Sequence, residues 1–275
     1  MDLKKISFCD KDSFNVNSNK YKKYILERIN YENIIKKINF DSYKNVYQNK
    51  LLNNDYFISE ITRGNNYLLL LFKDNLNKNV CLLIDCKTCQ GYEYPRINFV
   101  NYRFAEKLYN NTLFTCELLK TESNWTLLIT DILNYCNKNM FYSTFYERLD
   151  KIYNVMKNYY KEDKYLEVCQ LKVKQYKYKD DIGDFNSKLG YNFIPNNPNL
   201  EKFRYRFKSE RNNKNDRNKN GISKNTLSRQ NHVKINNELP DEKISLQNNN
   251  LQNIQISNSL QSSNNLQSSN SLQLQ

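Results

Sequence analysis

The chain of 275 residues contains little glycine, proline or histidine: five Gly, four Pro and a single His, His232. With so few of the usual turn formers, we expect its strands to be joined by Asn-rich loops. The lone histidine lies in a polar C-terminal segment, where it has no ordered partner. A Ser-His or Cys-His hydrolase is therefore not expected.

Long apolar runs are missing as well. No stretch approaches the ~18 apolar residues of a membrane-spanning helix, and the N-terminus has no signal-peptide pattern. The seven cysteines are an odd number, which argues against a disulfide framework and indicates a reducing, intracellular setting. Cys86 and Cys89 have the spacing of half a zinc site, but no second pair or nearby histidine completes it. We expect neither a metal nor a cofactor.

Aromatic residues stop at Phe207. Residues 209–275 are mainly Asn, Ser, Gln and Lys with scattered Leu, a composition that buries too little apolar surface to fold. We predict a disordered tail there. The remainder is long enough for one sizeable core and divides into an N-terminal helical segment, 1–50, and a main domain, 51–208.

Basic residues are in excess. The chain has 42 Lys and Arg against 29 Asp and Glu, a net charge of +13, and residues 1–208 hold 34 of the bases and 24 of the acids, a net +10. A basic domain attracts polyanions, nucleic acid above all. The alternative is a lysine- and asparagine-rich genome that raises the net charge without functional meaning.

Apolar periodicity predicts a mixture of strands and helices. Four short runs rich in Leu, Ile and Val, at 66–72, 80–85, 112–119 and 126–133, are typical of strands, and a further strand is expected at 165–173. Helices are predicted at 19–38 and at 144–157, the second opening with a capping box, "TFYE". Because strands and helices do not alternate strictly, the pattern favours an α+β fold with antiparallel or mixed sheets.

The order of these segments resembles the nucleotidyltransferase fold of mRNA-capping guanylyltransferases and ligase adenylation domains, over roughly residues 55–208. The best part lies at 125–152, an apolar strand ending in Asp-Ile-Leu followed by a helix that opens with Phe-x-x-Arg-Leu. The residues that match are Asp131, Ile132, Leu133, Phe145, Arg148 and Leu149.

The resemblance implies a lysine nucleophile in a Lys-x-Asp-Gly loop. Ile61 stands in the lysine's place and Arg63 in the aspartate's, while Gly64 is retained. The Asp-Gly-Glu segment reads Thr115-Cys116-Glu117 and the later Asp-Gly segment reads Leu189-Gly190. Since isoleucine offers no lone pair for attack on a phosphate, we predict that the chain is not an enzyme.

A fold of this kind without its lysine is similar to the snurportin-like cap-binding domains, whose "LFTCELL"-like segment also occurs at 113–119. The resemblance implies an adaptor that recognises the trimethylguanosine cap of small nuclear RNAs and shuttles between cytoplasm and nucleus. Its partners would be a small nuclear RNP and, through the basic helix 19–38, importin-β. That helix is poor in arginine, and a packing helix with a solvated lysine face is an equal alternative.

The expected cap and RNA contacts follow from this resemblance. The family's stacking tryptophan falls near "EKFRYRFK", 201–208, so Phe203 or Tyr205 would supply the aromatic face. Trp125 is a candidate too, although a place in the core or at a sheet edge is favoured for it. The candidate RNA-contacting residues are Arg63, Lys73, Lys87, Glu117, Trp125, Phe203, Arg204, Tyr205 and Arg206.

Two alternatives stay open beside this interpretation. The first is a divergent mRNA-capping guanylyltransferase, or the inactive partner subunit of one. Lys73 and Lys87 lie close to the loop in sequence, but neither has the loop position needed to replace the missing nucleophile. The second alternative is a basic interaction protein with a different fold.

Overall fold

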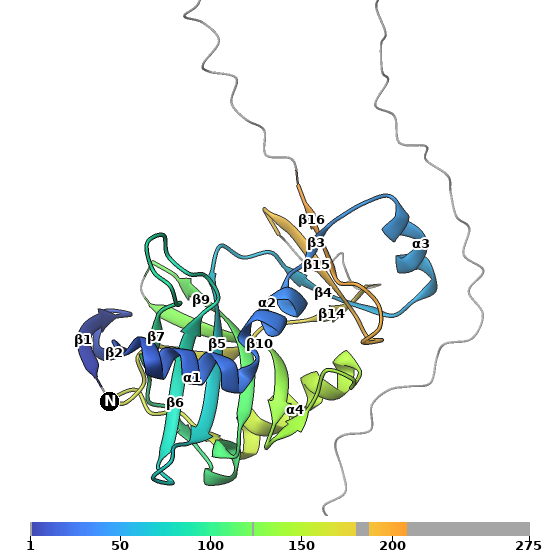
Figure 1. Ribbon diagram of the computed structural model, residues 1–275. Coiled ribbons are helices and arrows are strands. Elements are labelled where there is room, and N and C mark those ends of the chain that lie inside the picture. The colour runs from blue at the N-terminus through green and yellow to red at the C-terminus, as the bar shows by residue number, and fades with distance from the viewer. Residues whose placement is uncertain (1, 123, 180–186, 208–275) are drawn as a thin grey trace, which may run out of the picture. The chain divides into compact units, whose positions relative to one another are not determined.

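The computed structural model describes residues 2–122, 124–179 and 187–207, which belong to one compact unit. The segment predicted to be a disordered tail, 209–275, lies outside the described residues. Within them the fold is α+β, as predicted, with one large mixed sheet, one smaller mixed sheet and few helices (Figure 1).

The large sheet has the strand order β1-β2-β7-β6-β5-β9-β10-β11, and β13 pairs with β10. All its pairings are antiparallel except β10 with β13. Its strands are β1 (Leu3–Phe8), β2 (Lys11–Val16), β5 (Asn65–Lys73), β6 (Asn79–Asp85), β7 (Ile97–Phe99), β9 (Thr112–Lys120), β10 (Trp125–Tyr135), β11 (Lys138–Asn139) and β13 (Gln170–Val173).

The four predicted Leu-, Ile- and Val-rich strands are confirmed as β5, β6, β9 and β10. Their apolar runs are continuous because both faces of the large sheet are covered. In β5, Leu69 and Leu71 join one core while Leu68 and Leu70 join the core on the opposite face. The strand predicted at 165–173 is right only for its last four residues, which form β13.

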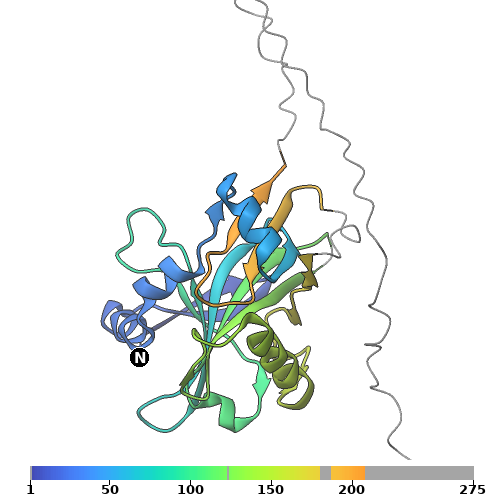
Figure 2. The ribbon, with the colours of Figure 1, turned by 90° about the vertical axis from the view of Figure 1, so that its right-hand side faces the viewer.

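Helices cover the two faces of this sheet (Figures 1 and 2). On one face lie α1 (Asn19–Ile29) and α2 (Tyr31–Ile38); on the other lie α4 (Phe145–Asn158) and a 3-10 turn, η1 (Glu106–Tyr109). The prediction of one helix over 19–38 is wrong in this respect, because Asn30 adopts a left-handed conformation (φ 53°) that ends α1. The capping box of α4 is confirmed, with Thr144 and Glu147 bonded reciprocally.

The smaller sheet has the order β14-β4-β15-β16-β3. Its strands are β3 (Asp41–Ser42), β4 (Tyr56–Glu60), β14 (Lys177–Tyr178), β15 (Gly190–Pro195) and β16 (Phe203–Arg206). Helix α3 (Val46–Asn53) covers its outer face, where Tyr47 packs on Phe203. A separate pair joins β8 (Arg103–Phe104) to β12 (Tyr160–Lys161).

The segment 1–50 was predicted to be helical and is so only in part. It contributes the β1-β2 hairpin to the edge of the large sheet and β3 to the small one, besides α1, α2 and the start of α3. In the part of the chain that the structure describes, no helix is long and apolar enough to span a membrane.

Candidate ligand-binding cleft

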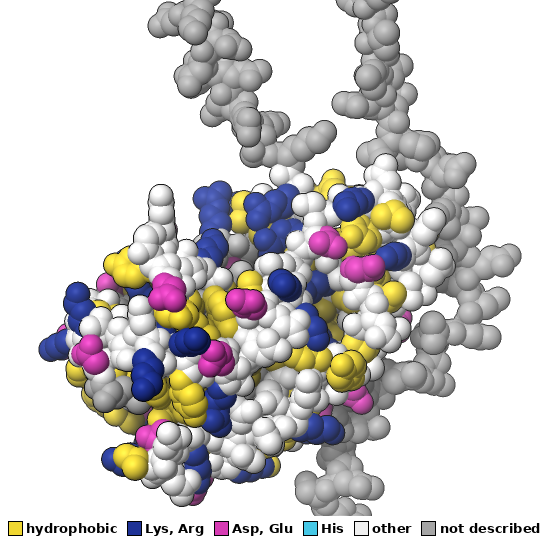
Figure 3. Space-filling model, in the orientation of Figure 1, with side chains coloured by type: hydrophobic (Ala, Val, Ile, Leu, Met, Phe, Trp, Pro, Cys, Tyr) yellow, Lys and Arg dark blue, Asp and Glu magenta, His cyan; other side chains and the backbone are white. Residues whose placement is uncertain are grey.

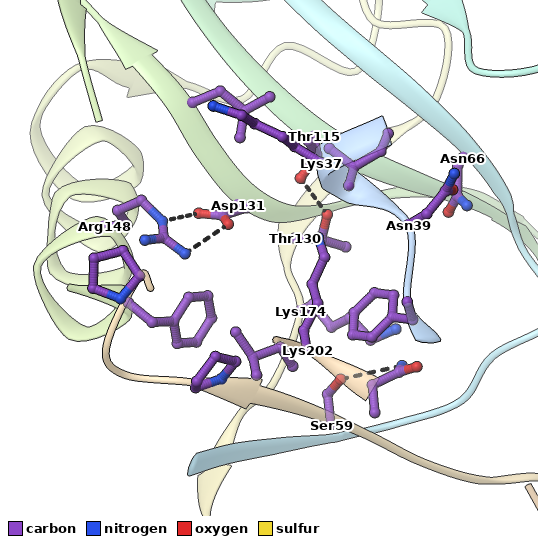
Figure 4. A pocket seen from close by; sticks show the side chains of 18 of the residues that line it. Lys37, Asn39, Ser59, Asn66, Thr115, Thr130, Asp131, Arg148, Lys174 and Lys202 are labelled. Carbon is purple, nitrogen blue, oxygen red and sulfur yellow. Dashed lines mark hydrogen bonds and ion pairs between the residues drawn. The ribbon is translucent and has the colours of Figure 1, made fainter. Parts of the chain in front are cut away.

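A cleft of about 530 Å³ lies between the two sheets. Strands β5, β9 and β10 line it from the large sheet, and β4, β15 and β16 line it from the small one. The end of α2 and the start of α4 complete its walls. Figure 4 shows Thr115, Thr130 and Asp131 on the large-sheet side and Ser59 on the small-sheet side.

A buried ion pair lies on the large-sheet side of the cleft. The Nζ of Lys174 is 2.7 Å from Oε2 of Glu117, and the two side chains are 8% and 9% exposed. Burial by itself raises the pKa of Glu117, but the Lys174 ammonium and the Gly64 N–H outweigh it and lower that pKa below its ordinary value. Glu117 is therefore ionised, and Lys174 is held as its counter-ion.

The loop 61–64 lies against this pair. The Gly64 N–H donates to Oε1 of Glu117 at 3.1 Å, and a Cβ on Gly64 would come within 2.3 Å of the Glu117 Cγ, so only glycine fits. At the other end of the loop, the buried Ile61 donates its N–H to the Gly190 carbonyl at 2.9 Å. The three segments that sequence comparison singled out, 61–64, 115–117 and 189–190, thus meet in space.

A second ion pair forms another wall. Arg148 of α4 donates two hydrogen bonds to Asp131 of β10, from Nε to Oδ1 at 2.8 Å and from Nη2 to Oδ2 at 3.1 Å (Figure 4). A third nitrogen of Arg148 donates to the Ser143 carbonyl at 2.7 Å. This bidentate geometry fixes both side chains, so they define the shape of the cleft more than its charge.

Four further cations line the cleft without a carboxylate partner among the described residues: Lys36, Lys37, Lys202 and Arg204. Burial lowers the pKa of Lys202 to about 8, and its ammonium lies 4.9 Å from the centre of the Phe40 ring. Burial, followed by the charge of Arg206, also lowers the pKa of Arg204. The Nε of Arg204 donates to Oδ1 of Asn192 at 2.7 Å, which aims the guanidinium.

Figure 3 shows several Lys and Arg side chains gathered at the upper edge of the described part, with few acids among them. Three of the four cleft cations named above lie over aromatic rings: Lys202 and Arg204 over Phe40, and Lys37 4.1 Å from the centre of the Phe141 ring. Tyr142 is 81% exposed and also lines the cleft. This combination of cations and open aromatic rings suits an anionic ligand that carries a flat base.

Of the residues predicted from the sequence as RNA contacts, only Glu117 and Arg204 line the cleft. Arg63 is exposed in the loop beside it, and Lys87 is exposed in the turn after β6. Lys73 ends β5 and pairs with Glu106 at 2.8 Å. Lys73 lies at the opposite end of β5 from Arg63 and Lys87, so the three residues do not form one group.

Trp125 opens β10 away from the cleft. Its Nε1 donates to Oδ2 of Asp10 at 2.7 Å, and its ring packs against the core beneath α4. This packing fits the interpretation of Trp125 as a residue of the core or of a sheet edge, and Trp125 does not line the cleft.

The two residues proposed as the stacking face lie on the wrong side of β16. Phe203 is fully buried, stacked between Tyr47 at 4.5 Å and Phe193 at 4.9 Å, so neither of its faces is free. Tyr205 is 44% exposed but packs edge-on against Tyr43 on the same outer face. Strand alternation turns Arg204 and the exposed Arg206 the other way, although Arg206 itself does not line the cleft.

Sequence reasoning missed Lys174, Lys202, Phe40 and Tyr142 as cleft residues. Lys202 could have been predicted from the sequence. It directly precedes β16, and because alternate residues of a strand share a face, it lies on the same side as Arg204. Among the described residues, no cluster of three His, Cys, Asp or Glu side chains is arranged to hold a metal ion, and Cys86 and Cys89 are free thiols.

No family model matches the chain, and no curated protein matches it. The chemistry of the cleft is therefore what indicates the ligand. It offers cations for phosphates, open rings for a base, and polar side chains on both sheets.

Proposed function

We propose that this chain is a non-catalytic RNA cap-binding protein with a nucleotidyltransferase-like domain, similar to the snurportin cap-binding domain. The observation that carries the proposal is the cleft between the two sheets, where the segments 61–64, 115–117 and 189–190 meet. In the enzymes of that fold, the corresponding segments surround the nucleotide. Their convergence here supports the same use of the cleft.

The loop 61–64 has no amine placed to act as a nucleophile. Ile61 occupies the position of the nucleophile and has no group that can attack a phosphate. The amine nearest the loop, Lys174, donates to Thr62 and is paired with Glu117. Both hydrogen bonds hold the Lys174 amine within the protein, so it is not free to attack a ligand in the cleft.

The cleft's cations and rings fit the two parts of a cap. A methylated guanine is positively charged and stacks on an electron-rich ring, for which the exposed Tyr142 is the available face. The phosphate bridge would lie against Lys37, Lys202 and Arg204, which have no carboxylate partner among the described residues. Tyr142 thereby replaces Phe203 and Tyr205 in the proposal.

The adaptor role extends the same proposal: the bound RNA would be that of a small nuclear RNP, and the protein would shuttle between cytoplasm and nucleus. Helices α1 and α2 pack on the large sheet through Ile25, Ile29 and Ile34, as in the packing-helix alternative. Recognition by importin-β would therefore use only their exposed lysines.

The experiment is a comparison of trimethylguanosine-capped and uncapped oligonucleotides of one sequence by fluorescence anisotropy. We expect tighter binding of the capped RNA, and a loss of roughly ten- to a hundredfold in Tyr142→Ala, the range for removing one stacking ring. Tyr205→Ala is the matched control, since it removes an exposed ring outside the cleft. Equal affinity of the wild type for both RNAs contradicts cap recognition.

A second candidate function is that of a divergent guanylyltransferase, and one observation favours it. Lys202 is a cleft amine whose pKa, lowered by burial to about 8, leaves part of it unprotonated near neutral pH. Incubation with labelled GTP and a divalent metal separates the two functions. An acid-labile labelled band that is lost in Lys202→Arg supports the enzyme; no band supports the binding protein.

A further inference from the structure

A second cavity lies apart from the cleft, between the β1-β2 hairpin, α1 and the segment 86–96 that joins β6 to β7. Its volume is about 300 Å³. Figure 1 shows the hairpin beside α1 and β7, at the far end of the large sheet from α4. None of the residues that line this cavity lines the cleft.

Three cations line it: Lys4 of β1, Lys22 of α1 and Arg96. No carboxylate is among the lining residues, and none of the three cations forms an ion pair with an acid of the described part. Such a group of like charges repels itself, so it favours an anion between them.

Lys22 makes the strongest case for an anion. The residue is only 7% exposed, and its ammonium forms no ion pair with an acid of the described part. An ammonium on a largely buried side chain has lost part of its hydration, so an anion in the cavity would stabilise it. Consistent with this, burial and the neighbouring Arg96 lower the pKa of Lys22.

An open ring stands at the same cavity. Tyr92 is 70% exposed and lines it together with Tyr94. Cations interleaved with exposed aromatic rings are the usual arrangement for single-stranded nucleic acid, in which phosphates bind the cations and bases stack on the rings.

We propose that this cavity binds one nucleotide of a single-stranded RNA, with its phosphate at Lys4, Lys22 and Arg96 and its base on Tyr92. The segment 86–96 begins beside the cleft, because Cys86 donates its N–H to the carbonyl of Asn66, a cleft residue, at 3.1 Å. One strand can then follow this segment from cleft to cavity. The identity of that strand as capped RNA rests on the proposed function; the nucleotide site itself does not.

The test measures binding of an uncapped single-stranded oligonucleotide by fluorescence anisotropy at several salt concentrations. Arg96→Gln is expected to weaken binding several-fold and to reduce the slope of log affinity against log salt by roughly 0.7 for the lost phosphate contact. Tyr92→Ala is expected to weaken it about tenfold or more with the slope unchanged. Both residues are exposed or at the cavity rim, so neither substitution removes core packing.

Lys5→Gln is the matched control for charge. Lys5 lies on β1 beside Lys4 but pairs with Asp12 and does not line the cavity. An equal loss in Lys5→Gln and Arg96→Gln overturns the site, because the effect would then be net charge alone. Unchanged affinity in both Arg96→Gln and Tyr92→Ala overturns it as well.

Two further arms separate this site from the cleft and from free phosphate. A cap mononucleotide should bind Arg96→Gln and Tyr92→Ala as tightly as the wild type, whereas Tyr142→Ala should lose it. If capped and uncapped RNA bind equally and Tyr92→Ala still weakens both, the cap proposal fails and this site stands. Competition by inorganic phosphate without any binding of RNA overturns the nucleotide assignment.

Discussion

The ammonium of Lys174 lies 2.7 Å from the carboxylate of Glu117, and both side chains are more than nine-tenths buried. The same carboxylate receives the N–H of Gly64, so the pair ties β9, the loop 61–64 and the chain after β13 together. In the nucleotidyltransferases that the sequence resembles, the corresponding loop carries the nucleophilic lysine. In this chain the loop carries Ile61, and it is held in place by the Lys174–Glu117 ion pair.

The first prediction concerns that pair. Lys174→Met should lower the free energy of unfolding by about 3–5 kcal/mol, because it leaves the Glu117 charge buried without a counter-ion. The double variant Lys174→Met with Glu117→Gln should recover much of this loss. Urea denaturation of the three proteins measures it, and a loss under about 1 kcal/mol in the single variant would contradict the buried pair.

The second prediction separates the neighbours Phe203 and Tyr205. Phe203→Ala should cost about 3–5 kcal/mol of stability, since it empties the stack between Tyr47 and Phe193. Tyr205→Ala, at a half-exposed ring, should cost about 1 kcal/mol or less. Thermal melting of the two variants and the wild type measures both losses of stability. Similar costs for the two variants would show that β16 is turned differently.

The third prediction uses the pH dependence of stability. Burial lowers the pKa of Lys202 to about 8, well below that of an unfolded lysine. Below pH 8 both states are protonated and the folded state carries the full cost of burying the charge. Between about pH 8 and 10 the folded state has released the proton while the unfolded state keeps it, so stability rises with pH.

Lys202→Met should remove this rise. The variant is expected to be more stable than the wild type near pH 7, with the difference shrinking by about pH 9.5. Urea denaturation at the two pH values measures the difference. Lys36→Met, which removes an exposed lysine of the same cleft, is the control; a pH-independent difference for Lys202→Met would argue against a buried ammonium.

The large sheet was predictable because its strands carry a local signal. Runs such as 66–72 are apolar on both faces, and the capping box at 144–147 fixes the start of α4. The strands β15 and β16 were not predicted. Their residues alternate between a core of rings under α3 and the cleft, so neither stretch is a continuous apolar run: β15 mixes aromatic and polar residues, and β16 mixes aromatic and basic ones.

The cleft residues were harder to predict than the strands, for a physical reason. A lysine's role depends on whether a carboxylate lies within reach in space, which spacing along the chain does not reveal. Lys174 and Glu117 are 57 residues apart, and Lys73 pairs with Glu106 across 33 residues. Stacking residues are hard to predict for a similar reason. On β16, neighbouring positions face opposite sides of the sheet, so an error of one position exchanges a cleft residue for a core residue.

The last prediction tests the direction in which β16 presents its arginines. Arg204 lines the cleft and is aimed by Asn192, whereas Arg206 is exposed and does not line it. Arg204→Gln should therefore weaken binding of a small trimethylguanosine cap analogue about tenfold or more, the loss of one charge-assisted contact of about 1.5–3 kcal/mol. Arg206→Gln, which removes the same charge two residues away, should leave the analogue's affinity unchanged and weaken only a longer capped RNA.

Isothermal titration with the analogue and anisotropy with the RNA measure the two effects. Equal losses of the analogue in both variants would mean that the cleft acts through its overall positive potential rather than through a positioned guanidinium.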